Sequence, residues 1–156
     1  MVMSNGSQLP DISLSELKTY HVGALESGAH RALRQYKDDL LNRYNISGME
    51  WYVIGAVADS GDKGTRITDL ANYMGTTLGF MTKTVNMLAA KDFLVREANP
   101  KDARTNTVRL ADGKQETVDK IEIELRQRLR ESIYGMLTRE ELATYVKVIK
   151  LFSEIQ

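Results

Sequence analysis

The feature that most restricts the fold is a pair of short helical segments joined by a glycine-containing link. The apolar pattern predicts helices over Thr68–Met74 and Leu78–Lys91, with Gly75-Thr76-Thr77 between them. Thr77 suits the cap of the second helix, because its hydroxyl oxygen can accept a backbone N–H from the first turn. On the second helix, Met81, Val85 and Leu88 are expected to face inward. Two helices joined by so short a link form a helix-turn-helix.

After the second helix the periodicity changes from helical to alternating. Phe93–Glu97 and Thr107–Leu110 are predicted to be the strands of a hairpin, and the polar segment 98–106 is predicted to be its tip. A hairpin directly after a helix-turn-helix is the arrangement of a winged helix. The sequence therefore predicts a winged helix-turn-helix in the middle of the chain.

Helical patterns flank this region on both sides. Helices are expected from about Ser15 to Tyr44 and from Met49 to about Asp59, and helical periodicity returns over residues 118–136 before a last helix from Arg139 to Phe152. Three capping boxes are predicted at helix starts, namely Ser13/Glu16, Ser47/Glu50 and Thr138/Glu141. A first helix of about 30 residues is long for a small domain and indicates a partner helix. The predicted fold class is mainly α, in the order four helices, two strands and two helices.

Composition excludes several kinds of site. The chain has no cysteine and only two histidines, His21 and His30, so disulfides and thiolate metal sites are excluded and no metal or cofactor is expected. No apolar run approaches the roughly 20 residues that cross a bilayer, and the N-terminal residues do not resemble a secretory signal. We therefore expect a cytoplasmic protein that does not enter a membrane.

No sequence motif indicates catalysis. A glycine-rich phosphate loop, the pattern G-x-S-x-G, the pattern H-E-x-x-H and a cysteine nucleophile are all missing, so the chain is not expected to be an enzyme. The formal net charge is zero, whereas nucleic-acid-binding domains usually carry a basic excess. This neutrality leaves open a second hypothesis, in which the winged helix is a protein–protein interaction adaptor that binds no operator.

Three short motifs follow one another along the chain. Ile67-Thr68-Asp69-Leu70-Ala71 opens the helix-turn-helix, Asp102-Ala103-Arg104 lies in the hairpin, and Leu110-Ala111-Asp112-Gly113 leads into a helix. As an ordered set they resemble the MarR (multiple antibiotic resistance regulator) family. There are two departures from its pattern. Asp92 stands where the family often has Gly in a left-handed conformation, which Asp tolerates well. Phe80 stands where the family usually has a small polar residue.

The resemblance implies both an assembly and a function. MarR-like proteins are homodimers in which the long first helix and the last two helices interlock. Residues 11–46 and 114–156 would then form a helical dimerisation region, and residues 47–113 would form the DNA-binding winged helix. The implied function is a sequence-specific transcriptional regulator, with repression as the expected mode, that binds a palindromic operator in double-stranded DNA. Release by a small aromatic effector is also implied.

The residues expected to contact DNA lie on the second helix of the pair and on the hairpin: Thr77, Thr82, Lys83, Asn86, Lys101 and Arg104. Asn86 could pair with adenine through two hydrogen bonds, and Lys83 could reach guanine or a phosphate. Arg104 is expected in or beside the minor groove, where the negative potential attracts a guanidinium.

Asp102 is expected to stabilise the hairpin by pairing with Arg66 or Arg109. Four aromatic residues could line a ligand pocket, but packing in the core is the preferred interpretation for each of them: Tyr36, Tyr44, Trp51 and Tyr52. No ligand-binding residue is therefore assigned.

Overall fold

The computed structural model of the chain describes residues 13, 15–99 and 102–155. It divides into two compact units, residues 1–35 and residues 36–156. The first unit contributes most of a long helix. The second contains all other elements.

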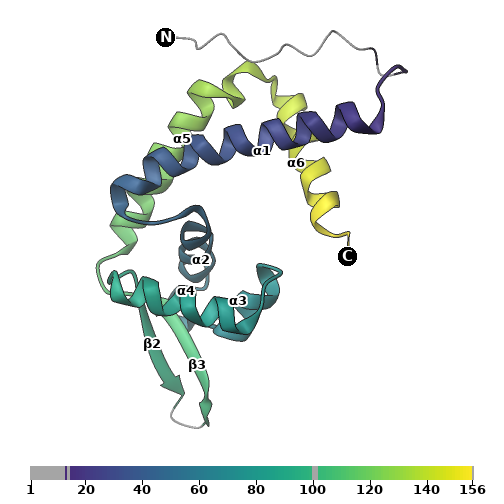
Figure 1. The fold of residues 1–156 in the computed structure, drawn as a ribbon. Coiled ribbons are helices and arrows are strands. Elements are labelled where there is room, and N and C mark those ends of the chain that lie inside the picture. Colours follow the sequence, from purple (N-terminus) through teal and green to yellow (C-terminus); the bar gives the residue numbers. More distant parts are fainter. Residues whose placement is uncertain (1–12, 14, 100–101, 156) are drawn as a thin grey trace. The chain divides into compact units, whose positions relative to one another are not determined.

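The described chain is mainly helical, as the sequence predicts (Figure 1). Its α-helices are α1 (Thr19–Leu41), α2 (Gly48–Asp59), α3 (Ile67–Tyr73), α4 (Leu78–Ala90), α5 (Gln115–Ser132) and α6 (Arg139–Ser153). Its strands are β1 (Thr65–Arg66), β2 (Leu94–Asn99) and β3 (Asp102–Leu110). The order of elements is that of a winged helix-turn-helix flanked by helices, so the predicted fold class is confirmed.

One apolar core joins the helix-turn-helix, the hairpin and the first half of α5. The buried side chains from α2, α4 and α5 include Val53, Ile54, Val57, Met81, Val85, Leu88, Val118, Ile121 and Leu125. The three that were expected to face inward from the second helix of the pair are all fully buried. Because α5 shares this core, its N-terminal half holds its position relative to α4 by close packing.

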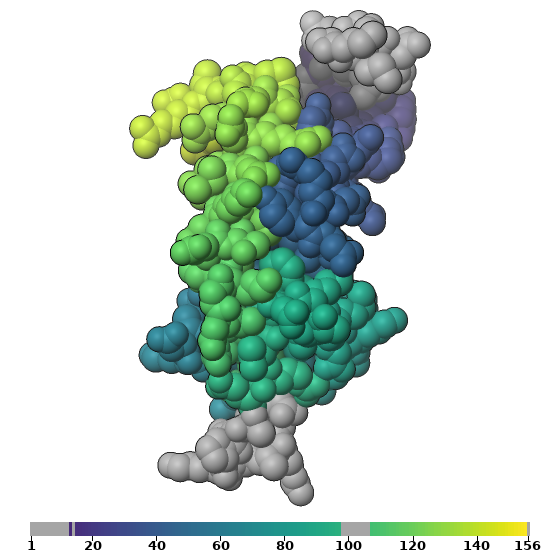
Figure 2. Space-filling view, turned by 90° about the vertical axis from the view of Figure 1, so that its left-hand side faces the viewer, coloured from purple at the N-terminus to yellow at the C-terminus, as the bar shows by residue number. Residues whose placement is uncertain are grey.

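Ion pairs join the second half of α5 to the segment that precedes α2. Arg43 contacts Glu124 and Arg128 contacts Asp39, each with a nitrogen–oxygen distance of 3.2 Å. Figure 2 shows α5 in green beside this blue segment. Tyr44, half-buried against the core as expected, donates its hydroxyl to the same Glu124 at 2.9 Å. Burial, then the hydrogen bond to Glu124, raises the pKa of Tyr44.

The sheet has the order β1–β3–β2, and both pairs are antiparallel. Leu94 lies opposite Leu110, and Arg96 lies opposite the buried Val108. Both predicted strands exist, but they extend into the segment 98–106, which was expected to be a loop. The sequence of this extension does not alternate between apolar and polar residues, so the pattern does not predict a strand there. The extension is recognised by its backbone pairing.

The first helix is shorter than predicted. It begins at Thr19 instead of Ser15 and ends at Leu41, followed by a 3₁₀ turn over Asn42–Tyr44. The Ser13/Glu16 capping box is also wrong, because the Ser13 hydroxyl donates to the Glu16 carboxylate at 2.6 Å and the Glu16 N–H bonds the backbone oxygen of Ser13. The other two boxes are confirmed, with both reciprocal hydrogen bonds present at Ser47/Glu50 and at Thr138/Glu141.

Two residues in the left-handed region position the hairpin. Asp92, between α4 and β2, has φ 58°, as the sequence predicts for this helix end. Gly64, just before β1, has φ 61°, and a Cβ atom there would lie 2.8 Å from the carbonyl oxygen of Val108. Only glycine adopts this positive φ without strain and leaves room for the Val108 carbonyl oxygen, so Gly64 lets β1 approach β3. Among the described residues, no helix is both long and apolar enough to span a bilayer.

Candidate nucleic-acid interface

The second helix of the pair, α4, presents a narrow polar face. Thr77 caps it, accepting the backbone N–H of Phe80 at 3.3 Å, as predicted. With one side of α4 buried in the core, helical spacing places Gly79, Lys83 and Asn86 on the opposite side. Lys83 and Asn86 are both exposed, and Lys83 makes no ion pair with any described residue. This face therefore offers a free cation and an amide to a ligand.

The two threonines expected to contact DNA are engaged within the helix. Thr82 is half-buried, and its hydroxyl donates to the carbonyl oxygen of Leu78 at 2.8 Å. Thr77 uses a lone pair of its oxygen for the cap, so its O–H remains available as a donor. Of the two, Thr77 is the better placed to contact a phosphate or a base.

Arg96 of β2 contacts the polar face of α4, which the sequence analysis missed. Its guanidinium donates to Oδ1 of Asn86 at 2.6 Å. A guanidinium has no acceptor, so the Asn86 carbonyl must face Arg96 and the amide NH₂ must point away from it. Asn86 therefore presents mainly donors. A two-bond pair with adenine, which also needs the carbonyl, would compete with Arg96.

A second contact that the sequence analysis missed fixes the other end of α4. Lys91, directly after the helix, pairs with Glu50 of α2 at 2.7 Å, and Glu50 is only 4% exposed. The second carboxylate oxygen of Glu50 accepts the N–H of Ser47 at 2.7 Å. Burial raises the pKa of Glu50, but the hydrogen bonds from Lys91 and Ser47 outweigh it and leave the pKa below its ordinary value. Lys91 is thus a structural residue rather than part of the exposed polar face.

The predicted wing residues are only partly described. Lys101 lies outside the described residues, and so do the side chains of Asp102 and Arg104. Of the two arginines proposed to pair with Asp102, Arg66 is exposed, whereas Arg109 donates to Glu97 at 2.5 Å and to Asp112 at 2.8 Å. The hydrogen bonds with Glu97 and Asp112 raise the pKa of Arg109 further above its usual value. The proposed role of Asp102 stays a prediction.

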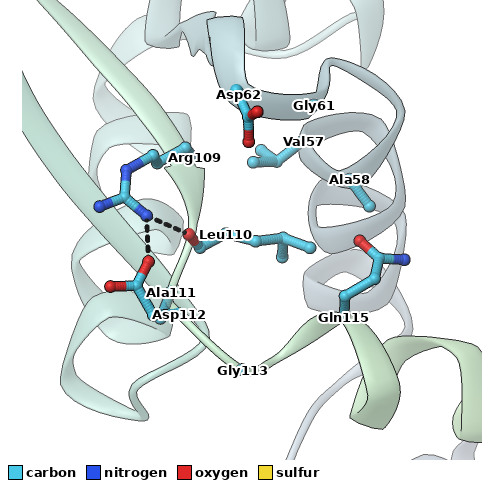
Figure 3. A pocket seen from close by; sticks show the side chains of 10 residues that line it. All are labelled: Val57, Ala58, Gly61, Asp62, Arg109, Leu110, Ala111, Asp112, Gly113 and Gln115. Carbon is cyan, nitrogen blue, oxygen red and sulfur yellow. Dashed lines mark hydrogen bonds and ion pairs between the residues drawn. The ribbon is translucent and has the colours of Figure 1, made fainter.

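A small pocket of about 230 Å³ lies where β3 passes into α5. Its walls come from α2 and the following turn on one side and from residues 109–115 on the other (Figure 3). Among the described residues that line it, Arg109 is the one cation, and Figure 3 shows its guanidinium turned to Asp112 and to the backbone oxygen of Leu110. Since that guanidinium is already paired, this pocket offers little to an anionic ligand.

A larger hollow of about 790 Å³ opens between α2, α3, α5 and the end of α6. Trp51, Tyr52 and Tyr73 form its aromatic part, and Asp59 and Asp119 are among its polar residues. Trp51 packs partly against the core, as expected, but Tyr52 is 42% exposed. In the described part of the chain, no group of His, Cys, Asp and Glu side chains could hold a metal ion.

Taken together, a capped second helix with an exposed polar face and an antiparallel hairpin behind it define a winged helix-turn-helix protein. Residues 44–105 match the model of the MarR family. This match covers the winged helix and agrees with the resemblance predicted from its motifs. Two structures with this fold, AbsC and Sco3205 from Streptomyces coelicolor, are MarR family transcriptional regulators.

Several solved structures share the fold. MarR from Escherichia coli in its apo form is 21% identical, with a TM-score of 0.68, covering 83% of this chain and 94% of that chain. The MarR family transcriptional regulator Sco3205 from Streptomyces coelicolor, in complex with DNA, is 20% identical, with a TM-score of 0.79 and coverages of 96% and 92%. BpsR from Bordetella bronchiseptica, whose DNA binding is regulated by 6-hydroxynicotinic acid, is 18% identical, with a TM-score of 0.74 and coverages of 92% and 98%. A comparison with curated protein sequences gave no match.

Proposed function

We propose that the protein is a sequence-specific DNA-binding regulator of transcription that acts as a homodimer. The observation that carries the proposal is the exposed face of α4, where Lys83 has no ion pair with a described residue and Asn86 presents its amide donors, in a winged helix that matches the MarR family model. Such a helix places its N-terminal residues against base edges in the major groove. Sco3205, which has the same fold, was solved in complex with DNA.

The proposed dimer rests on the apolar surface of α6. None of its 15 residues, all of which the structure describes, is buried. Nevertheless one side of the helix is apolar, formed by Leu142, Tyr145, Val146, Ile149 and Phe152. An amphipathic helix with no buried residue and an exposed apolar side requires a partner, and a second copy is the simplest one. We accordingly retain residues 11–46 and 114–156 as the dimerisation region.

A two-fold dimer would present two copies of α4 and two wings to one side of a duplex. Its operator would be palindromic, with half-sites about one helical turn apart. We propose repression by steric exclusion, in which the bound dimer blocks a promoter in the cytoplasm. The experiment that tests this function is selection of bound duplexes from a random library, followed by the affinity of the enriched duplex across a salt series. A two-fold-symmetric motif with affinity that falls steeply with salt is the expected result.

The alternative function, a protein–protein adaptor, is favoured by the zero net charge. The same selection separates the two, because an adaptor enriches no duplex and shows no salt-dependent DNA binding. In that outcome the wing would be the surface to examine for a protein partner.

We further propose that Arg104 contacts DNA from the wing. Arg104→Ala should weaken operator binding by about 1–3 kcal/mol, because a guanidinium in the minor groove is lost, and should leave the fold intact. Fluorescence anisotropy with the selected duplex measures the first effect and a thermal melt measures the second. Lys120→Ala, which removes an exposed cation from α5, is the matched control. Unchanged affinity in Arg104→Ala would exclude the wing from DNA recognition.

The large hollow next to α2 is the proposed site of an effector. Its three aromatic side chains suit a small aromatic compound, and the carboxylates of Asp59 and Asp119 disfavour a negatively charged one. Binding there would change the spacing of the two DNA-reading helices in the dimer. Calorimetry with neutral and cationic aromatic compounds tests the effector; no binding and no change in DNA affinity would oppose it.

A further inference from the structure

A large aromatic side chain stands exposed in the first turn of α4. Phe80 is 46% exposed, whereas Phe93, the other phenylalanine of the winged helix, is 5% exposed. Its backbone is held on both sides, since its N–H bonds the Thr77 hydroxyl at 3.3 Å and its carbonyl accepts the Thr84 hydroxyl at 3.0 Å. The position of Phe80 is therefore determined by the helix cap, and its ring is presented to solvent.

The neighbours of Phe80 are those of the proposed DNA-binding face. Thr77 lies just before it, and Lys83 follows one turn later, about 60° around the helix axis. Exposed Leu78 and Met87 lie on the flanks of the same helix. These separate apolar side chains, interrupted by polar ones, do not form the continuous patch that a stable protein interface requires.

The major groove offers one apolar group to such a side chain. Base edges there are donors and acceptors, except for the C5-methyl group of thymine, which phenylalanine and other apolar residues contact. Residues in the first turn of the second helix are those that reach base edges.

We propose that Phe80 is a specificity-determining residue that contacts the C5-methyl group of a thymine in each operator half-site. The inference rests on the proposed DNA-binding function and adds to it a base that the operator must contain. Thr77 and Lys83 would hold the adjacent backbone or bases, while the aromatic ring excludes water from the methyl group.

The test replaces thymine by deoxyuridine, which differs only in that methyl group. Each thymine of the selected duplex is replaced in turn, in both half-sites at once, and the dissociation constant is measured by fluorescence anisotropy. At one symmetric position the substitution should weaken binding about fourfold for each half-site, or about fifteenfold for the duplex, from the burial of one methyl group. At the remaining thymines the dissociation constant should change less than twofold.

A protein variant assigns the effect to Phe80. In Phe80→Ala the difference between thymine and deoxyuridine at that position should disappear, whereas Met87→Ala, which removes an exposed apolar side chain from the later part of α4, should retain it. Both side chains are exposed, and equal thermal melts would verify that both variants fold.

The outcomes separate the two proposals. If no duplex is enriched in the selection, the proposed function and the role of Phe80 are both rejected. If a duplex is enriched but no thymine is sensitive, or the sensitivity persists in Phe80→Ala, DNA binding stands and the role of Phe80 is rejected.

Discussion

Replacing Lys91 with Met should lower the free energy of unfolding by about 3 kcal/mol at pH 7. The substitution keeps the length of the side chain but leaves the Glu50 carboxylate, 4% exposed, without its cation. Removing one partner of a buried ion pair costs about 3–5 kcal/mol, and the lower end applies because the Lys91 side chain is 23% exposed. Chemical denaturation monitored by circular dichroism measures the change.

The pH dependence identifies the ion pair as the cause. Glu50 has a lowered pKa in the folded protein, so its stabilising effect is complete above the ordinary value of 4.5 and is lost as the pH falls through the lowered pKa. In Lys91→Met, burial would instead raise the pKa of Glu50, and a neutral carboxyl group tolerates burial. The stability difference between the two proteins should therefore shrink as the pH falls below about 5.

Lys83→Met is the matched control, because Lys83 lies on the helix that Lys91 follows but is exposed and has no ion pair with a described residue. It should change the stability by less than about 0.5 kcal/mol at any pH. Adding Glu50→Gln to Lys91→Met should restore part of the lost stability, since the buried charge is then gone. A loss in Lys91→Met that stays constant from pH 7 to pH 4 would contradict this account.

Local patterns are sufficient to predict the helix-turn-helix. Its two helices, the Thr77 cap and the inward side of α4 depend on residues within a few positions of one another, and each is found as predicted. The left-handed Asp92 was predictable for the same reason, because the requirement belongs to one helix end. The candidate DNA-binding face follows from these local features, because the exposed side of α4 is known once its buried side is known.

Contacts between distant segments could not be predicted in this way. Glu50 and Lys91 are 41 residues apart, and in the sequence each looks like an ordinary charged residue of a helix. Arg96 and the buried Leu94 are two residues apart in β2, so the alternation of a strand places them on the same side. This is the one hint in the sequence that Arg96 turns toward α4. Without the packing of β2 on α4, nothing in the sequence selects Asn86 as its partner.

The largest expected effect concerns α6. Replacing both Ile149 and Phe152 with Glu should convert the protein from a dimer to a monomer, because two charges would enter an apolar contact surface. Multi-angle light scattering and sedimentation velocity report the mass directly. The substitutions do not enter the core, as no α6 residue is buried in the described chain, so a folded monomer is expected by circular dichroism.

Loss of the dimer should weaken binding to the palindromic duplex by a factor of about 100 or more. Two linked winged helices bind one duplex with a high effective concentration for the second contact, and a monomer forfeits that advantage. A single half-site duplex should by contrast be bound about equally by both proteins, which separates loss of avidity from damage to α4. Lys147→Glu reverses a charge on the polar side of α6 and should keep both the mass and the affinity. If the variant with Ile149→Glu and Phe152→Glu remains dimeric, α6 is not the dimer contact. If this variant is monomeric yet binds the palindrome as tightly as the unsubstituted protein, one winged helix alone supplies the affinity.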